Sequence, residues 1–368
     1  MSKLLSSLAM LALASYVSAE EEKTPVEGKF TPPVNPILTR RLTINDFHME
    51  IVLSITFIAL AFVWFQGKTT NLKKAKTWVN DQIEFLESQF ALVGDKLSNE
   101  KSVLMVDGPA DFLLYTSGRR NVQFGHWWLK MKPRNDILTF FTTQVLALVG
   151  YAKPSTDRVN LTMALDKSIP EKFVFAVVKK DLANELHKKR FDLKRVGKVA
   201  SSKVLPANLT IYAETQKLAD TILAGKVGEI LAQTSDRLES LIISSLPEEE
   251  PEMFEADSFI TVSLNFVMPS TAGFDPLVEL ACELPDVVGQ LRLTGDVKSK
   301  INKNRDELVK EFSKRVAADR AEELQKKKAE AKRAEEERVK KMTPAEQRKW
   351  EEKERARNMK KQQKKKKM

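Results

Sequence analysis

The stretch IVLSITFIALAFVWF, residues 51–65, decides the architecture of this 368-residue chain because it contains no charged side chain. Together with its flanking residues it forms an apolar segment, 47–67, that approaches the roughly 20 residues needed to cross about 30 Å of hydrocarbon. Its C-terminal end is aromatic, as in an aromatic belt, and four lysines follow at once. A buried core helix is the alternative, since the segment is short for a span. We expect a transmembrane helix whose anchoring side chains are Ile51, Phe57, Phe62, Trp64 and Phe65.

The first 46 residues have the pattern of an exported N-terminus. Residues 1–19, MSKLLSSLAMLALASYVSA, combine Lys3, a short apolar core and small residues before Ala19, as in a secretory signal peptide. An uncleaved anchor or an ordinary helix is the alternative. Residues 20–46 contain four prolines and no apolar periodicity, which predicts a short, extended luminal segment.

The orientation of the chain follows from its charges and its signal peptide. The lysines after the span favour the cytosolic side, and the signal peptide sends the N-terminus across the membrane. We therefore predict a single-pass type I protein of the endoplasmic reticulum membrane, with a short luminal N-terminus and residues 68–368 in the cytosol. The glycosylation sequons at Asn160 and Asn208 should then carry no glycan.

Strands and helices without regular alternation predict one cytosolic α+β domain over residues 75–295. Alternating or continuous apolar runs predict strands at 112–115, 122–129, 159–165, 173–178 and 259–267. Apolar residues at three- and four-residue steps predict helices at 78–93, 135–148 with Asn135 as its cap, 181–190, 218–246, and 277–291 with a kink or break at Pro285.

The domain shows no recognisable catalytic or cofactor-binding motif. The three histidines are far apart, and no glycine-rich phosphate loop, nucleophile elbow or zinc-binding helix occurs. Glu84 and Glu87 could act as an acid–base pair, but both fall on the polar side of their predicted helix. The lone cysteine, Cys282, lies in an apolar run and is expected to be a buried core residue. We expect a protein that is not an enzyme and has no cofactor or metal.

The basic residues of the chain are concentrated at its C-terminal end. Residues 298–368, which we call the basic tail, hold 27 Lys and Arg against 14 Asp and Glu, whereas residues 1–297 hold 33 against 36. From 298 to 341 the tail has neither Gly nor Pro and consists mainly of helix-forming residues. Thr343, Pro344 and Glu346 then have the pattern of a helix start. The end, KKQQKKKK at 360–367, is expected to lack regular structure on its own.

Such a tail is suited to phosphate-rich partners. Many lysines aligned with RNA phosphates release counterions and give salt-sensitive binding with little sequence preference. The alternatives are a tail that binds anionic lipid head groups and a tail that is simply solvated. The residues that we expect to bind RNA are Lys326, Lys327, Lys328, Lys332, Arg333, Lys340, Lys341, Arg348, Lys349, Lys360, Lys361, Lys364, Lys365, Lys366 and Lys367.

Several strings resemble the calumin family, coiled-coil-domain-containing endoplasmic reticulum membrane proteins that are subunits of the PAT complex. They are Trp78-x-Asn80, the string from Glu84 to Gly94, Ser117-Gly118-Arg119, Phe173 to Val177, and the pair Asn304-Arg305. The resemblance covers most of residues 47–368, and the string from Glu84 to Gly94 is its most specific part. It implies a transmembrane helix, a cytosolic α+β domain and a long, charged, coiled-coil-like helix.

The resemblance also implies a role in membrane-protein biogenesis. Family members bind the ribosome and the Sec translocon, and they pair with a small membrane chaperone that shields multipass clients. Animal members carry a long acidic luminal region linked to calcium, whereas the luminal segment here offers few acidic residues, so a role in calcium homeostasis is less favoured. The chain could instead be a tether to anionic membrane surfaces or a membrane-anchored enzyme with an unrecognised site.

Overall fold

The computed structural model of the chain describes residues 47–95, 103–151, 154–252, 254, 259–341 and 343–366. The predicted signal peptide, residues 1–19, and luminal segment, residues 20–46, lie outside the described residues. Residues 59–368 belong to one compact unit, and the turns of the first described helix up to Ile58 belong to another.

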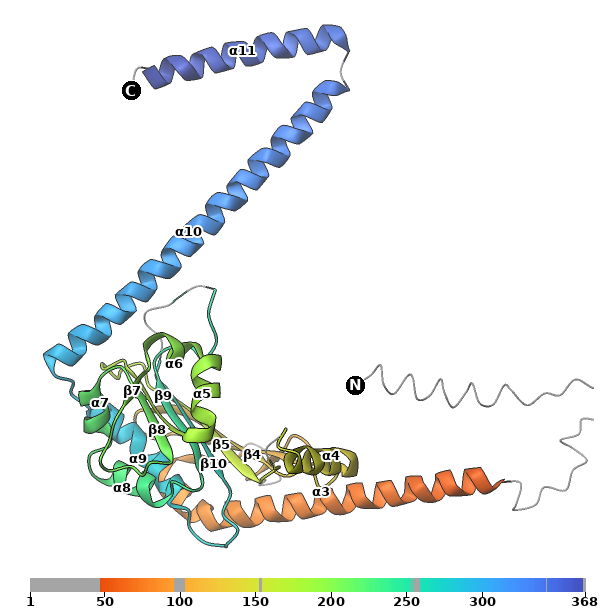
Figure 1. Ribbon diagram of the computed structural model, residues 1–368, viewed down its shortest axis with the longest axis vertical. Coiled ribbons are helices and arrows are strands. Elements are labelled where there is room, and N and C mark those ends of the chain that lie inside the picture. The colour runs from red at the N-terminus through yellow and green to blue at the C-terminus, as the bar shows by residue number, and fades with distance from the viewer. Residues whose placement is uncertain are drawn as a thin grey trace, which may run out of the picture. The chain divides into compact units, whose positions relative to one another are not determined.

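Within the described residues, ten strands form one sheet in which every neighbouring pair is antiparallel (Figure 1). Their order is β1-β3-β4-β5-β10-β9-β6-β8-β7, and β2 pairs with β3. The strands are β1 (Leu92–Val93), β2 (Met105–Val106), β3 (Asp111–Ser117), β4 (Val122–Lys130), β5 (Arg158–Leu165), β6 (Val174–Lys179), β7 (Lys198–Ala200), β8 (Leu209–Ala213), β9 (Leu238–Ser244) and β10 (Thr261–Val267).

The helices lie before, between and after these strands. They are α3 (His48–Gln89), α4 (Ile137–Leu148), α5 (Lys180–Lys189), α6 (Phe191–Val196), α7 (Gln216–Ile222), α8 (Lys226–Gln233), α9 (Pro276–Gln290), α10 (Gly295–Lys340) and α11 (Pro344–Lys366). The mixture of helices with an antiparallel sheet confirms the α+β class. A long apolar helix near the N-terminal end and a long charged helix near the C-terminal end complete the predicted architecture.

Two hydrophobic cores form on opposite faces of the sheet. Strand β6 is buried on both faces: Phe175 and Val177 enter the larger core, and Val174, Ala176 and Val178 enter the smaller one. Helices α3, α7, α8 and α9 contribute to the larger core, whereas α5 and α6 contribute to the smaller one. The continuous apolar run of β6 thus reflects burial on both faces.

Helix α3 continues without a break from the apolar segment into the domain core. The sequence predicted a span and a separate helix from residue 78, but one helix of 42 residues covers both. Its buried residues begin at Gly67 and recur at helical spacing, so the C-terminal half of the helix packs on the sheet. The polar linker residues 68–76 include no helix breaker, which is why the helix does not stop.

Several predicted elements are confirmed and others need correction. The five predicted strands correspond to β3, β4, β5, β6 and β10. The predicted helix 218–246 is wrong, because Gly225 has φ 75° between α7 and α8, and residues 238–244 form β9. The cap of α4 is Asp136 rather than Asn135, since the Asp136 carboxylate accepts from the N–H groups of Leu138 and Thr139. Helix α9 runs through Pro285 without splitting.

Candidate functional site

Helix α3 contacts the rest of the domain through a group of four polar residues, Asn71, Lys132, Arg134 and Asp157, which we call the neck cluster. Asn71, fully buried on α3, donates from Nδ2 to the Pro109 carbonyl at 3.2 Å and to the Lys132 carbonyl at 3.1 Å. Its Oδ1 accepts from Arg134 Nη1 at 2.8 Å. The side chain therefore ties α3 to the loops on either side of the β3–β4 hairpin.

Asp157 completes the neck cluster from the strand side. Its carboxylate accepts two bonds from the Arg134 guanidinium, at 2.8 and 2.7 Å, and one from the Lys132 N–H at 2.8 Å. Burial raises the pKa of Asp157, but the Arg134 and Lys132 hydrogen bonds and the charges of Arg134 and Lys74 outweigh it, so the pKa lies below its ordinary value. The carboxylate is therefore ionised at neutral pH and holds the loop before α4 against α3.

The predicted anchoring residues all lie on the apolar part of α3. Among the described residues, α3 is the one helix long and apolar enough to cross a membrane, and its most apolar part is not buried in the protein. The exposed residues of this part include Ile51, Phe57, Phe62, Trp64 and Phe65. The Lys68 ammonium lies 5.3 Å from the Trp64 ring centroid, where the apolar segment ends.

The first third of α10 is docked on the domain and joins its two cores. Val297 and Ile301 belong to the larger core, whereas Leu308 and Phe312 belong to the smaller one. These residues follow one another at steps of four and seven, which place them on one face of the helix. Phe312 also stacks with Phe254 at 5.8 Å. The helix therefore crosses from one side of the sheet to the other.

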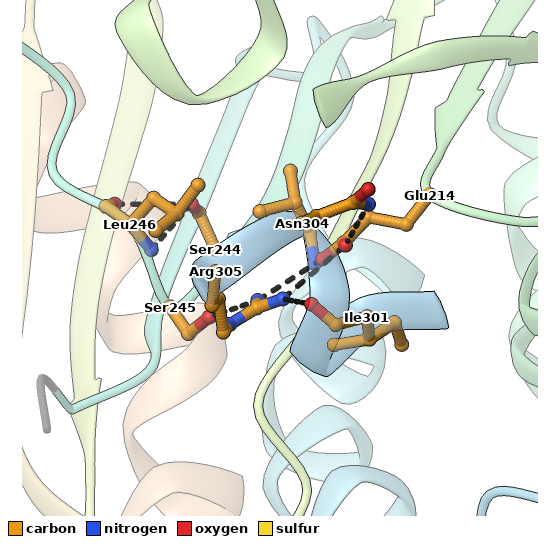
Figure 2. Close-up of polar contacts among 8 residues, drawn as sticks. Glu214, Ser244, Ser245, Leu246, Ile301, Asn304 and Arg305 are labelled. Atoms are coloured by element: carbon orange, nitrogen blue, oxygen red, sulfur yellow. Dashed lines mark hydrogen bonds and ion pairs between the residues drawn. The ribbon is translucent and has the colours of Figure 1, made fainter. Parts of the chain in front are cut away.

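At this crossing a buried ion pair fixes α10 to the sheet. Arg305 donates from Nη2 to Glu214 Oε1 at 3.0 Å and from Nη1 to Glu214 Oε2 at 3.2 Å, and Glu214 is fully buried (Figure 2). Arg305 Nη2 also donates to Ser245 Oγ at 2.7 Å, and Asn304 Nδ2 donates to Glu214 Oε2 at 3.0 Å. We call Glu214, Ser245, Asn304 and Arg305 the tail clamp.

The Glu214 carboxylate in the clamp is fully satisfied by hydrogen bonds. Besides the bonds from α10, its Oε1 accepts from the Val174 N–H at 2.9 Å, so four donors surround the two oxygens. A buried carboxylate is tolerated only when it is paired and hydrogen-bonded in this way. The clamp therefore links α10 to both β6 and the end of β8.

Beyond Phe312 the helix becomes exposed and carries the predicted RNA-binding residues. Lys326, Lys327 and Lys328 follow one another at about 100° steps, so their charges spread over about 200° of the helix circumference instead of forming one stripe. Lys326 pairs with Glu322 at 2.8 Å. The other predicted residues on α10 and at its end are Lys332, Arg333, Lys340 and Lys341.

Helix α11 carries most of the remaining predicted residues. Thr343 and Glu346 form the predicted start, since the Glu346 carboxylate accepts from the Thr343 hydroxyl at 2.7 Å and from its N–H at 3.1 Å. The helix continues to Lys366, so the expectation of an unstructured end at 360–367 is wrong for its described part, where helix-forming residues extend the helix. Arg348, Lys349, Lys360, Lys361, Lys364, Lys365 and Lys366 lie on this helix, and Lys367 lies outside the described residues.

No cluster of side chains suited to metal binding occurs in the part of the chain that the structure describes. Three or more His, Cys, Asp or Glu side chains do not gather there as metal ligands would. Cys282 is buried, and burial raises the pKa of its thiol to about 12. The thiol is therefore protonated at neutral pH and unsuited to act as a nucleophile.

Local sequence patterns did not predict the residues that hold the two helices. Glu214 and Arg305 are 91 positions apart, and no local pattern joins them. Asn71 and Arg134 likewise come from segments 63 residues apart. The pair Asn304-Arg305 was noted only for the family resemblance, and the position of Arg305 four residues after Ile301 was a further available signal.

The sequence is similar to known proteins over most of its length. The family model described as PAT complex subunit CCDC47 matches residues 46–361. An endoplasmic reticulum membrane protein of Schizosaccharomyces pombe is 28% identical over 254 residues, which cover 66% of this chain and 67% of the relative.

The PAT complex subunit CCDC47 of Danio rerio is 28% identical over 304 residues, covering 76% of this chain and 61% of the relative. The human protein of that name is 26% identical over 309 residues, covering 78% of this chain and 62% of the relative. The chain thus spans about three fifths of the length of these animal relatives. Because the family model covers most of its residues, this chain belongs to the PAT complex subunit CCDC47 family.

Proposed function

We propose that the chain is a non-enzymatic scaffold of the endoplasmic reticulum membrane that assists insertion and folding of multipass membrane proteins within a PAT-type complex. Its partners are the ribosome, the Sec translocon and a small membrane chaperone. The observation that carries the proposal is that two long helices extend from one domain. One has an exposed apolar part, and the other is a basic helix whose first part is docked on the domain and whose remainder is exposed. Family membership supports the PAT-type complex, and the names of the relatives support the membrane.

The proposed division of labour follows the two helices. Helix α3 crosses the membrane with residues 68–368 on the cytosolic side, and the exposed part of α10 with α11 meets ribosomal RNA. At 1.5 Å per residue, the 28 residues from Ser313 to Lys340 extend about 42 Å, which is enough to contact several phosphates. The tail clamp fixes the base of this arm, so a contact at its end constrains the domain.

A sedimentation experiment tests ribosome binding. Detergent-solubilised microsomes are centrifuged through sucrose at low and high salt, comparing the full chain with a chain that ends at Ala318. This end point keeps Arg305 and Phe312, which the fold needs. We expect the full chain to travel with ribosomes at low salt and the shortened chain to stay behind. Equal sedimentation of both chains would refute the assignment of the tail.

A charge-reversal pair tests which residues carry the contact. The test variant changes Lys326, Lys327, Lys328, Lys332 and Arg333 to Glu. The control makes the same change in net charge at five exposed lysines of the domain, namely Lys167, Lys180, Lys188, Lys189 and Lys203. We expect the test variant to lose salt-sensitive co-sedimentation and the control to retain it, because only the tail lysines would face phosphates. Equal loss in both variants would mean that net charge alone governs binding.

A tether to anionic membranes is the second candidate, and the same basic helix favours it. The full chain is floated with vesicles of neutral or anionic lipid, with and without competing RNA. Protection of the tail from protease is then measured, and it distinguishes the ribosome proposal from the tether. The ribosome proposal expects RNA to compete at the tail whatever the lipid. Tail protection that depends on anionic lipid and resists RNA would instead support the tether. A glycan at Asn160 or Asn208 would overturn the cytosolic orientation on which both rest.

A further inference from the structure

Helix α4 has an apolar surface that the folded domain leaves uncovered. The segment Ile137–Tyr151 contains no charged residue, and none of the residues of α4 is buried. Phe141 is 68% exposed and Leu148 is 89% exposed. The other large, exposed apolar residues of this segment are Ile137, Leu138, Phe140, Val145, Leu146, Val149 and Tyr151. Water-soluble domains rarely leave so contiguous an apolar patch open.

The pattern around the helix is inverted relative to a helix that packs on a soluble core. The half-buried positions are Thr139, Thr143, Gln144 and Ala147, which are small or polar, whereas the exposed positions are mainly Leu, Ile, Val and Phe. A soluble helix turns its large apolar residues inward. A helix that faces lipid has the opposite arrangement: its small and polar residues face protein, and its large apolar residues face outward.

The start of α4 is fixed where the apolar part of α3 ends. A Cβ atom added at Gly67 would lie 2.4 Å from the Arg134 carbonyl carbon and 2.4 Å from the Asn135 nitrogen, so the loop before α4 touches α3 there. Gly67 follows Phe65, the last apolar residue of the segment, by two positions, or about 3 Å along the helix axis. The neck cluster holds this loop in place through Arg134.

The length of α4 excludes a second span. Twelve residues extend about 18 Å, against about 30 Å of hydrocarbon. An apolar helix of this length that is not buried in a protein core is suited to the membrane interface. The Asp136 carboxylate caps two of the backbone N–H groups at its start, which lowers the cost of placing that end near lipid.

We propose that α4 is a second membrane-embedded element, an interfacial helix that lies in the lipid of the leaflet where α3 leaves the bilayer. The occupant of its apolar surface is phospholipid. The inference rests on the proposed membrane span of α3, and the experiment below reports on the two separately. With α4 embedded, the chain contacts the membrane at two places joined by the neck cluster, which restricts tilting of the domain against the bilayer.

The test uses the purified full chain reconstituted into phosphatidylcholine vesicles. Single cysteines are introduced as Phe141→Cys and Leu148→Cys on α4, Phe57→Cys on α3, and Val199→Cys on β7 as a matched exposed control. Val199 is 74% exposed and lies on the domain. The native Cys282 is 2% exposed and needs no replacement. Each thiol carries an environment-sensitive fluorophore, and the vesicles contain phosphatidylcholine with a doxyl quencher at carbon 5 or carbon 12.

The expected result is strong quenching at residues 141 and 148 by the carbon-5 quencher, with at least a twofold loss of fluorescence relative to residue 199. Residue 57 should be quenched by the carbon-12 quencher, which reports the span independently. If residue 57 is quenched but residues 141 and 148 behave like residue 199, the proposal for α4 is overturned while the span stands. Labelling at exposed positions leaves the fold intact, and far-ultraviolet circular dichroism checks this for each variant.

Discussion

Replacing Arg305 with methionine tests whether the tail clamp holds α10 on the domain. The change keeps an apolar stem but removes the guanidinium, which leaves the buried Glu214 carboxylate with only Asn304 Nδ2 and the Val174 N–H as donors. Removing one partner of a buried ion pair costs about 3–5 kcal/mol, because the remaining charge is uncompensated. At about 1.4 kcal/mol per tenfold change, opening of this region should become about 140- to 3700-fold more frequent.

Hydrogen exchange by mass spectrometry on the full chain in detergent measures this opening. We expect faster exchange for the amides of residues 301–312, and a lower free energy of unfolding in a denaturant titration. The matched control is Arg320→Met on the exposed part of the same helix, which should change stability by no more than about 0.5 kcal/mol. The double variant Glu214→Gln with Arg305→Met should lose less than the sum of the two single changes. An Arg305→Met cost below about 1 kcal/mol, or additive costs in the double variant, would refute the reasoning.

Three further predictions concern the neck and the core. Gly67→Val should destabilise the chain by about 1–3 kcal/mol in thermal unfolding, because the added side chain would collide with the Arg134 backbone, whereas Gly295→Ala, with open space around it, should not. The stabilisation from Asp157, whose pKa is depressed in the folded state, should be complete above its ordinary value of 3.8 and be lost as pH falls through the folded pKa. Asp157→Asn should remove this dependence in denaturation curves measured from neutral pH to well below 3.8, and an unchanged curve would contradict it. Cys282 should resist a thiol reagent at about pH 8 in the folded chain and react after denaturation, and rapid reaction in the folded chain would show that the core is open there.

Local sequence patterns predicted the elements whose burial is uniform. The apolar part of α3 lacks charge over fifteen residues, and β6 is a continuous apolar run, so neither depends on distant contacts for recognition. The start of α11 was equally predictable because Thr343 and Glu346 bond to one another within one turn.

Patterns failed where tertiary contacts decide the structure. Residues 238–244 resemble a helix in apolar spacing, yet they form β9 because β6 and β10 pair with both of its edges. The tail clamp could not be predicted, since a buried Glu214 and a buried Arg305 look like ordinary surface charges until the fold brings them together. The exposure of α4 could not be predicted either, because an apolar helix has the same sequence pattern whether protein or lipid covers it.

Because α3 is unbroken, the number of its residues sets a direction as well as a length. Each residue turns a helix by about 100° and advances it by about 1.5 Å, so the number of residues between Phe65 and Asn71 sets the direction in which the domain faces around the helix axis. One inserted residue would rotate the neck cluster by about a quarter turn around the helix axis. Seven inserted residues would nearly restore its direction and would move the domain by about 10 Å along that axis. For the proposed membrane span, the number of residues therefore sets the heading of the domain as well as its height above the bilayer, and with it the neighbours in the bilayer plane that the domain can reach.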